Sequence, residues 1–176
     1  MNNRKIFFKE INTKSIINVY HGSDTPVKKP KIIQSVRALD FGYGFYTTTN
    51  IEQAKNFAKI VKHRNKSSKS FISIYTLNIE LFKYFNIMFF NKPDKKWLNF
   101  VSSNRNETYT GELYDIIYGP VANDIIFKTF IAYQNGILNE KETLKRLKIR
   151  DLYNQMVFKN DESLKALDDS GELLNE

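Results

Sequence analysis

The two histidines of this chain stand in different surroundings. His63 lies within a basic run, residues 62–66, which is typical of a solvated surface. His21 follows the β-branched and aromatic run 16–20 and precedes Gly22, so it stands at the end of an expected strand. A side chain at a strand end can face a cleft and contact a ligand. Taken alone, His21 is better explained as a core or turn histidine held by a backbone hydrogen bond.

Two glycines between aromatic residues form the second candidate, in residues 42–46 (Gly-Tyr-Gly-Phe-Tyr). Glycine lets the backbone approach a ligand closely and adopt positive φ. The segment is not a dinucleotide-binding fingerprint, because Thr47 stands where the third glycine is required. On its own, such a pair is most often a tight turn, but its combination with His21 favours a ligand site.

Together these segments resemble the NAD-binding half of the ADP-ribosyltransferase superfamily, in its diphtheria-toxin and PARP-like branch. The resemblance rests on residues 19–23 (VYHGS) and 39–49 (LDFGYGFYTTT), followed by a helix that carries Gln53-Ala54. The third element of that branch is a strand bearing Glu or a substitute. Residues 152–158 (LYNQMVF) are similar to it, with Gln155 where Glu would stand.

A narrower resemblance connects the chain to the bacterial DUF3990 family. It rests on residues 114–124 (YDIIYGPVAND), and the likeness as a whole covers about residues 17 to 167. The first two motifs are fairly specific as a pair, whereas the third is short. The resemblance implies a single ADP-ribosyltransferase-like domain over residues 1–176, with a core at about residues 15–168, and NAD as co-substrate.

The resemblance also implies roles for individual residues. His21, Tyr46 and Gln155 form the implied catalytic set: His21 hydrogen-bonds a ribose hydroxyl, and Tyr46 stacks on the flat nicotinamide ring. Backbone groups of Gly22 bind the nicotinamide amide. The implied cofactor-binding residues are His21, Gly22, Ser23, Arg37, Gly44, Phe45 and Tyr46. An arginine fork suits a pyrophosphate, but Arg37 is equally well explained as one more surface cation.

Gln155 departs from the pattern of the branch. A Glu there would hold the ribose 2′-hydroxyl and stabilise developing positive charge, whereas Gln can hydrogen-bond but cannot act as a base. If a base is needed, the nearest carboxylate candidates are Asp115 and Asp124. Together with Asn123, they are the possible acceptor-side residues. Helix capping is a strong alternative explanation for Asp124.

Other chemistries find little support in the composition. The chain has no Cys, which excludes disulfides, thiolate metal sites and Cys nucleophiles, and two separated histidines leave no metal-ligand cluster at a recognisable spacing. A Gly-x-Ser-x-Gly sequence is absent as well. Neither a signal peptide nor a transmembrane segment is visible, so we expect a soluble cytoplasmic protein.

The net charge of +8 fits either a polyanion-binding surface or a lysine-rich solvated one. Lysines are dense at residues 55–69, and acidic residues gather near the C-terminus. The positive field is therefore expected to be lopsided. Nucleic acid is a credible partner on this ground, while a protein acceptor stays open.

Periodicity and capping signals predict mixed strands and helices without a regular βαβ rhythm. We expect an α+β fold with a split antiparallel β-sheet core and flanking helices. The expected strands cover residues 16–20, 71–77, 114–118 and 155–158, with a short extended piece at 47–49. The expected helices cover residues 51–64, the region of Trp97, 125–136, the region after Asn139, and a segment from Asp161 that includes Leu164 and Leu167.

The leading functional expectation is an NAD-dependent ADP-ribosyltransferase that modifies a macromolecule, RNA, DNA or protein, with release of nicotinamide. A role as a bacterial toxin or defence effector, with an antitoxin partner, follows only from what such families commonly do. Two alternatives stay open: an NAD glycohydrolase with water as acceptor, and a catalytically decayed, basic nucleic-acid-binding module.

Overall fold

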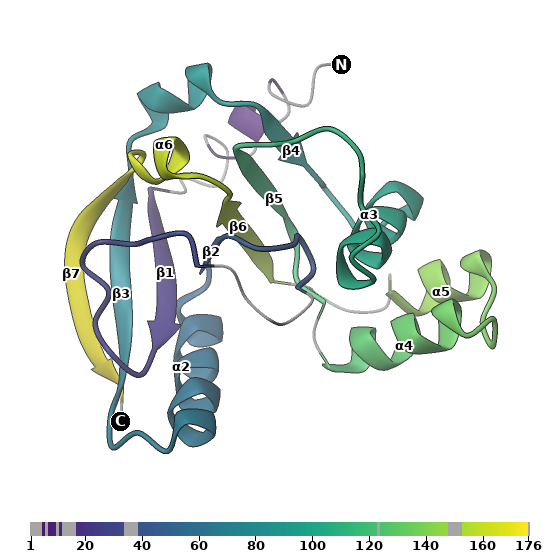
Figure 1. Cartoon of the computed structure of the whole chain (residues 1–176), viewed down its shortest axis with the longest axis horizontal. Helices are drawn as coiled ribbons and strands as arrows, with labels where there is room; N and C mark the ends of the chain where they lie inside the picture. The colour runs from purple at the N-terminus through teal and green to yellow at the C-terminus, as the bar shows by residue number, and fades with distance from the viewer. Residues whose placement is uncertain are drawn as a thin grey trace.

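A computed structural model describes residues 5, 7–9, 11, 17–33, 39–122, 124–147 and 153–175, without the side chains of residues 124, 125, 127 and 130. Its centre is a seven-stranded sheet in the order β4-β5-β6-β2-β1-β3-β7 (Figure 1). The strands are β1 (Asn18–Ser23), β2 (Phe45–Thr48), β3 (Ser70–Leu77), β4 (Ile87–Phe89), β5 (Ile116–Pro120), β6 (Asn154–Phe158) and β7 (Leu167–Asn175). The helices are α2 (Ile51–Asn65), α3 (Lys95–Arg105), α4 (Asp124–Gln134), α5 (Glu140–Leu147) and α6 (Asp161–Leu164), with a 3-10 helix at Ile79–Tyr84.

The sheet is mostly antiparallel, because only β4 and β5 run parallel. This confirms the α+β class. The sheet is continuous, and the expected split corresponds only to weak pairing between two neighbouring strands. β1 and β2 are joined by the single residue pair Tyr20–Thr48. On either side the pairing is longer, with six residue pairs between β1 and β3 and four between β2 and β6. The sheet therefore consists of two well-paired halves with a weakly paired junction between them.

The sequence predicts capping boxes at Asn50 with Gln53 and at Asn139 with Glu142, and the structure forms only the second in full. The Asn50 side chain accepts a hydrogen bond from the Gln53 backbone N–H at 2.9 Å, and α2 begins directly after it, but the Gln53 side chain accepts from Thr48 Oγ1 instead. At the start of α5, Asn139 and Glu142 form both reciprocal bonds, each at 3.0 Å. These bonds satisfy backbone N–H groups that have no partner inside a helix.

Three predicted elements differ from the structure. The strand expected at residues 16–20 runs from Asn18 to Ser23, so His21 lies within β1 and not at the end of a strand. The strand expected at residues 114–118 runs from Ile116 to Pro120, because Gly119 and Pro120 continue the pairing with β6 instead of ending it. The helix expected from Asp161 through Leu167 is only a single turn. Leu167 instead begins β7, which pairs with β3 along its whole length. Alternation of buried and exposed residues is weak in β7, so its sequence carries little strand signal.

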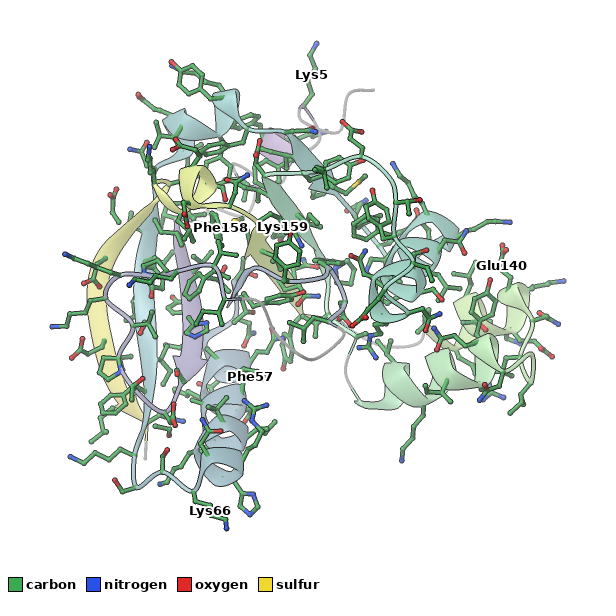
Figure 2. All side chains as sticks on the ribbon, in the orientation of Figure 1. Lys5, Phe57, Lys66, Glu140, Phe158 and Lys159 are labelled. Atoms are coloured by element: carbon green, nitrogen blue, oxygen red, sulfur yellow. The ribbon has the colours of Figure 1, made fainter. Side chains whose placement is uncertain are left out.

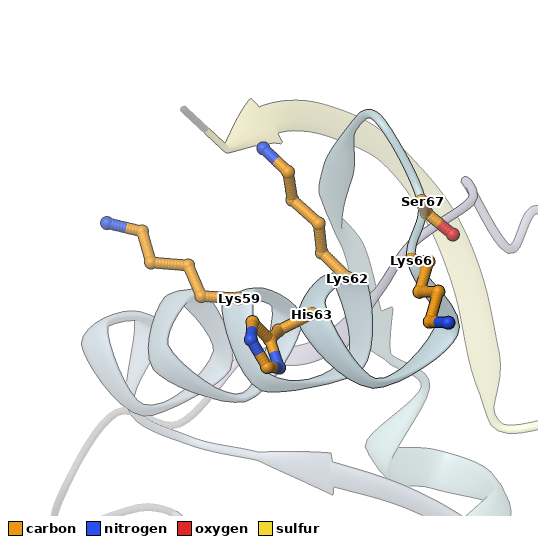
Figure 3. A pocket seen from close by; sticks show the side chains of 5 residues that line it. All are labelled: Lys59, Lys62, His63, Lys66 and Ser67. Atoms are coloured by element: carbon orange, nitrogen blue, oxygen red, sulfur yellow. The ribbon is translucent and has the colours of Figure 1, made fainter.

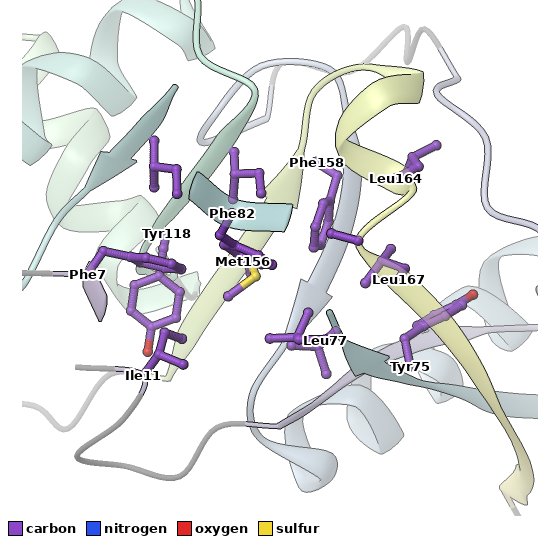
Figure 4. Close-up of a cluster of buried hydrophobic side chains, with 14 of the residues drawn as sticks. Phe7, Ile11, Tyr75, Leu77, Phe82, Tyr118, Met156, Phe158, Leu164 and Leu167 are labelled. Atoms are coloured by element: carbon purple, nitrogen blue, oxygen red, sulfur yellow. The ribbon is translucent and has the colours of Figure 1, made fainter. Parts of the chain in front are cut away.

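Two hydrophobic clusters stabilise the two faces of the sheet. One contains Phe7, Phe45, Tyr75, Met156 and Phe158, drawn in part in Figure 4. The other lies on the opposite face and contains, among others, Phe41, Trp97, Phe100, Ile117 and Val157. Because successive strand residues point to opposite faces, Val157 belongs to one cluster while its neighbours Met156 and Phe158 belong to the other.

The helices lie around the sheet in distinct places. Figure 1 shows α2 below β1 and β2, α3 beside β4 and β5, and the α4–α5 pair farther out on the same side as α3. The Lys95–Glu140 ion pair, at 2.8 Å, connects α3 to α5. None of the helices among the placed residues is long and apolar enough to cross a bilayer.

Candidate functional site

The three motifs singled out in the sequence occupy three neighbouring strands. His21 lies on β1, Tyr46 on β2 and Gln155 on β6, and the sheet order places β2 between the other two. Thr48 of β2 is paired with Tyr20 of β1 and with Gln155 of β6. Residues more than a hundred positions apart in the chain therefore meet at the β1–β2 junction.

His21 is held at this junction by a backbone hydrogen bond. Its Nδ1 lies 2.7 Å from the carbonyl oxygen of Tyr46, and a carbonyl only accepts, so Nδ1 carries the proton. Burial of the ring lowers the pKa of His21, against the opposing effect of that hydrogen bond, and so favours the neutral imidazole. The second ring nitrogen, Nε2, is then a hydrogen-bond acceptor. Phe45 fixes the ring plane, with ring centroids 4.5 Å apart.

Tyr46 is fixed at its hydroxyl end. The hydroxyl donates to the Gly42 carbonyl at 2.6 Å and accepts from the Phe41 N–H at 3.1 Å. Burial, together with the nearby negative charge of Asp40, raises the pKa of the Tyr46 hydroxyl, so the phenol stays neutral. Gly42 has φ +71°, a conformation that glycine adopts without strain, and this lets the turn close on the hydroxyl. The ring of Tyr46 is therefore held in a fixed orientation, and its hydroxyl does not ionise at neutral pH.

Gln155 is buried, and it contacts a carboxylate that sequence reasoning did not select. Its Nε2 donates to Asp40 Oδ2 at 3.2 Å. Because a carboxylate only accepts, the contact fixes the orientation of the amide and leaves Gln155 Oε1 as an acceptor. Asp40 also accepts from Arg105 Nε at 2.7 Å and from the Ala122 N–H at 2.9 Å. Asp40 and Arg105 form a buried ion pair, with side chains 7% and 15% exposed.

The three predicted catalytic residues do not share one face of the sheet. The side chains of Tyr20, Thr48 and Gln155 point to the same face, because Thr48 is paired with both of the others. His21 follows Tyr20 and points to the opposite face, where it contacts Phe45. A ligand that touches both His21 and Gln155 therefore has to pass through the junction between β1 and β2.

The other predicted NAD-binding residues have varied settings. Gly22 lies under α2, where a Cβ atom would be 2.2 Å from the Ala54 carbonyl oxygen, so helix packing by itself explains this glycine. Ser23 Oγ donates to Asp24 Oδ1 at 3.4 Å. Gly44 directly precedes β2, and Phe45 is a buried core residue behind His21. Arg37 lies outside the described residues.

The acceptor-side residues do not lie at the junction as far as the structure describes them. Asp115 lies four residues before Gly119, the partner of Gln155, or about 13 Å along β5. Its carboxylate accepts from the Asn86 N–H at 2.7 Å and from Asn160 Nδ2 at 2.6 Å. Asn123 lies outside the described residues. Helix α4 begins at Asp124, whose side chain is likewise not described.

Lys159 is a second residue that sequence reasoning missed. It follows β6, and its ammonium donates to the carbonyls of Phe41 and Tyr43, which places it behind the turn that holds Tyr46 (Figure 2). Burial lowers the pKa of Lys159 to about 8, while the two carbonyls favour the charged form. An open cavity of about 550 Å³ lies beside this turn, with Tyr43, Tyr109 and Lys159 among its lining residues.

Little in the sequence distinguishes Asp40, Arg105 or Lys159 from surface charges. Asp40 stands between two apolar residues, Leu39 and Phe41, which is the one local signal of burial. Arg105 is the last residue of α3, where basic side chains are common because they complement the helix dipole. No group of three or more His, Cys, Asp or Glu residues in the described part of the chain is arranged to hold a metal ion.

Comparison with known proteins gives one match. The model of the DUF3990 family, described as a protein of unknown function, matches residues 17–168. That range contains β1 to β6, and so all of the strands that form the junction. No curated protein and no solved structure matches the chain.

Proposed function

We propose that this chain, which belongs to the DUF3990 family, splits NAD and transfers ADP-ribose to a macromolecule with release of nicotinamide. One observation carries the proposal. The His21, Tyr46 and Gln155 motifs, which together resemble the NAD-binding elements of ADP-ribosyltransferases, lie on the adjacent strands β1, β2 and β6. A chance likeness of three short motifs gives no reason for them to meet in space.

His21 has the protonation state that the proposal requires. Its Nδ1 proton is committed to the Tyr46 carbonyl at 2.7 Å, so Nε2 can accept a hydrogen bond from a ribose hydroxyl. Because burial lowers the pKa of the ring, this acceptor stays available at neutral pH. A protonated imidazole would present a donor there and would repel the positive charge that develops as the nicotinamide–ribose bond breaks.

Gln155 is assigned the task of holding the ribose. Asp40 takes the amide N–H at 3.2 Å, so Oε1 is the atom left to accept the 2′-hydroxyl proton. The negative charge of Asp40 lies directly behind that amide, but the ion pair with Arg105 largely neutralises it. We therefore assign Gln155 positioning and dipolar stabilisation, and no proton transfer.

Tyr46 supplies a flat surface for the nicotinamide ring. Its hydroxyl is held by Gly42 and Phe41, so the ring does not have to be ordered when a ligand binds. A preorganised aromatic wall lowers the entropy cost of stacking. The ring of Tyr46 and the amide of Gln155 are on the same face of the sheet, which suits one nicotinamide riboside unit that contacts both.

The test measures nicotinamide release and transfer of labelled ADP-ribose from NAD to RNA, DNA or cell extract. We expect His21→Ala and Gln155→Ala to lower turnover at least tenfold while thermal unfolding stays cooperative. Tyr84→Ala is the matched control, since this aromatic side chain is 72% exposed and lies on the 3-10 helix away from the junction. The proposal is wrong if the parent protein neither binds NAD nor releases nicotinamide.

The variant Gln155→Glu tests whether residue 155 only positions the ribose or could also transfer a proton. The new carboxyl would lie against Asp40, and two carboxylates at that distance cannot both ionise readily. We expect the variant to be less active than the parent, and Asp40→Asn to restore part of the loss. Free ADP-ribose formed at the full rate without any macromolecule would assign the same site to an NAD glycohydrolase.

A further inference from the structure

A row of cations follows the outer side of α2. Lys59 and Lys62 stand at positions i and i+3, which share one face of α2, and Lys66 is the C-cap residue directly after the last helical residue, Asn65. We call these three residues the α2 stripe. They border a shallow hollow of about 560 Å³, together with His63 and Ser67. Figure 3 draws these side chains, with those of Lys59 and Lys62 extending away from that of Lys66.

The α2 stripe has no acidic partner among the residues that the structure places. Lys55, earlier on the same helix, is paired with Glu52 at 2.6 Å, whereas no ion pair involves the three lysines of the stripe. The carboxylate closest to the hollow in the hydrogen-bond network is Asp24, and neutral donors satisfy it: Ser67 Oγ at 2.6 Å and Asn65 Nδ2 at 3.0 Å. Among the described residues, the three lysines therefore form no direct ion pair, although the Asp24 carboxylate lies beside Ser67.

We propose that the α2 stripe binds the phosphate backbone of a nucleic acid. Like charges at helical spacing repel one another and lower the stability of α2. Phosphates bound along the stripe would neutralise the lysines and so relieve this repulsion. The proposal deepens the proposed function, because it names nucleic acid as the class of acceptor. Binding itself needs no NAD, so the two can be tested separately.

The layout of α2 argues against a membrane surface as the partner. A helix that lies in a membrane interface buries an apolar face between its cations. The apolar face of α2 is already packed on the sheet through Ala54, Ala58 and Val61. Two apolar residues of α2 are exposed, Phe57 and Ile60, and they lie about 160° and 100° around the helix from Lys59, away from the side on which the stripe makes contact.

The α2 stripe also lies within reach of the junction. Asn50, the N-cap of α2, donates its N–H to Thr48 Oγ1 at 3.1 Å, which attaches the start of the helix to β2. Lys59 and Lys66 follow at about 14 and 24 Å along the helix axis. A strand held by the stripe therefore needs only a few nucleotides to extend to the proposed NAD site.

The experiment is fluorescence anisotropy with a fluorescein-labelled single-stranded RNA 20-mer, without NAD, over a series of KCl concentrations. The variant is Lys59→Glu/Lys62→Glu/Lys66→Glu. The matched control, Lys141→Glu/Lys145→Glu/Arg146→Glu on α5, changes the net charge by the same amount at exposed positions. A Lys→Gln triple at the stripe provides a second variant without new negative charge, and circular dichroism checks that all of them fold.

For single strands, each phosphate contact contributes about −0.7 to the slope of log K against log salt concentration. Loss of the stripe should therefore reduce the steepness by about 2 and weaken binding at least tenfold at 100 mM KCl. The α5 control should stay within about twofold of the parent. An equal loss in both triples would show that diffuse charge and not a site binds the RNA, and unchanged binding in the stripe variants would overturn the proposal outright.

Two further arms identify the partner and separate this inference from the proposed function. Stripe-dependent binding of phosphatidylserine vesicles or of polyglutamate, equal to that of RNA, would assign the surface to another class of partner. Nicotinamide release from NAD, measured without RNA, should be the same in both triples. RNA binding without NAD cleavage would refute the proposed transferase activity and support RNA binding by the α2 stripe. NAD cleavage without RNA binding would support cleavage of NAD at the junction and refute RNA binding by the stripe.

Discussion

The ion pair between Asp40 and Arg105 offers a direct test of the site. Asp40→Asn keeps the shape of the side chain but removes the negative charge and one acceptor oxygen. In the parent, that carboxylate takes bonds from the Arg105 guanidinium, the Ala122 N–H and Gln155 Nε2. In Asp40→Asn, the amide NH2 faces one of these N–H donors, so that contact becomes repulsive. The buried guanidinium also loses its counter-charge.

The expected cost follows from the burial of the pair. Removing one partner of a buried ion pair costs about 3–5 kcal/mol, because the other charge stays buried without compensation. Asparagine retains one acceptor, which places Asp40→Asn at the lower end, about 3 kcal/mol. For a chain of this length, 1 kcal/mol corresponds to about 2–4 °C, so the midpoint of thermal unfolding should fall by about 6–12 °C.

Urea unfolding followed by circular dichroism measures this cost, and Glu162→Gln is the matched control. Glu162 is also paired, with Lys165 at 2.7 Å, but their side chains are 73% and 66% exposed. Exposed pairs of this kind contribute about 0.5 kcal/mol or less. The control should therefore leave the urea midpoint almost unchanged.

A double-mutant cycle with Arg105→Gln separates the pair from its surroundings. If the two side chains interact as the geometry indicates, the double variant loses much less than the sum of the two single variants, with a coupling energy of about 2 kcal/mol. Additive losses, or a cost of Asp40→Asn as small as that of Glu162→Gln, would refute the argument that Asp40 and Arg105 form a stabilising buried ion pair.

Two other predictions concern the β1 side of the junction. Because the folded pKa of His21 is lowered, the unfolded chain takes up a proton near pH 6.5 that the folded chain does not, so stability falls as the pH drops below 6.5. Between pH 7 and pH 5.5, urea titrations should show that the free energy of unfolding falls more in the parent than in His21→Asn. Parallel curves for the two proteins would contradict this. Gly22→Ala should cost about 3 kcal/mol, because the new Cβ would lie 2.2 Å from the Ala54 carbonyl oxygen of a packed helix. Gly136→Ala, where nothing lies within 4 Å, should cost about 1 kcal/mol from its positive φ alone, and equal losses would remove helix packing as the reason for Gly22.

Local signals were enough to predict most of the helices and strands. The helix from Ile51 could be predicted because Asn50 and the apolar spacing of Ala54, Ala58 and Val61 act within one turn or two. Strand β7 could not be predicted. Its residues 168–174 are exposed, and it is a strand only because β3 offers an unpaired edge for it. Such an element depends on a partner that is remote in the sequence, and no local pattern reports it.

The site was predicted in part, for a similar reason. His21, Tyr46 and Gln155 could be selected from motifs that each lie within a few residues. Asp40 and Arg105 form their contact across 65 positions, so no spacing rule connects them. The opposite orientations of His21 and Gln155 also depend on strand register, which is set by pairing and not by either motif.

The position of β6 next to β2 also governs when the site comes into existence. Thr48 Oγ1 donates to the Asn154 carbonyl, 106 residues later in the chain, so β2 has this partner only after those residues have been synthesised. At ribosomal speeds of 5–20 residues per second, β2 precedes β6 by about 5–20 s. Pairing at such separation is also slow in itself, because the loop entropy is lost before the contacts form. A chain interrupted during translation before Gln155 therefore carries His21 and Tyr46 without an assembled junction, so any activity there arises only after β6 has been synthesised.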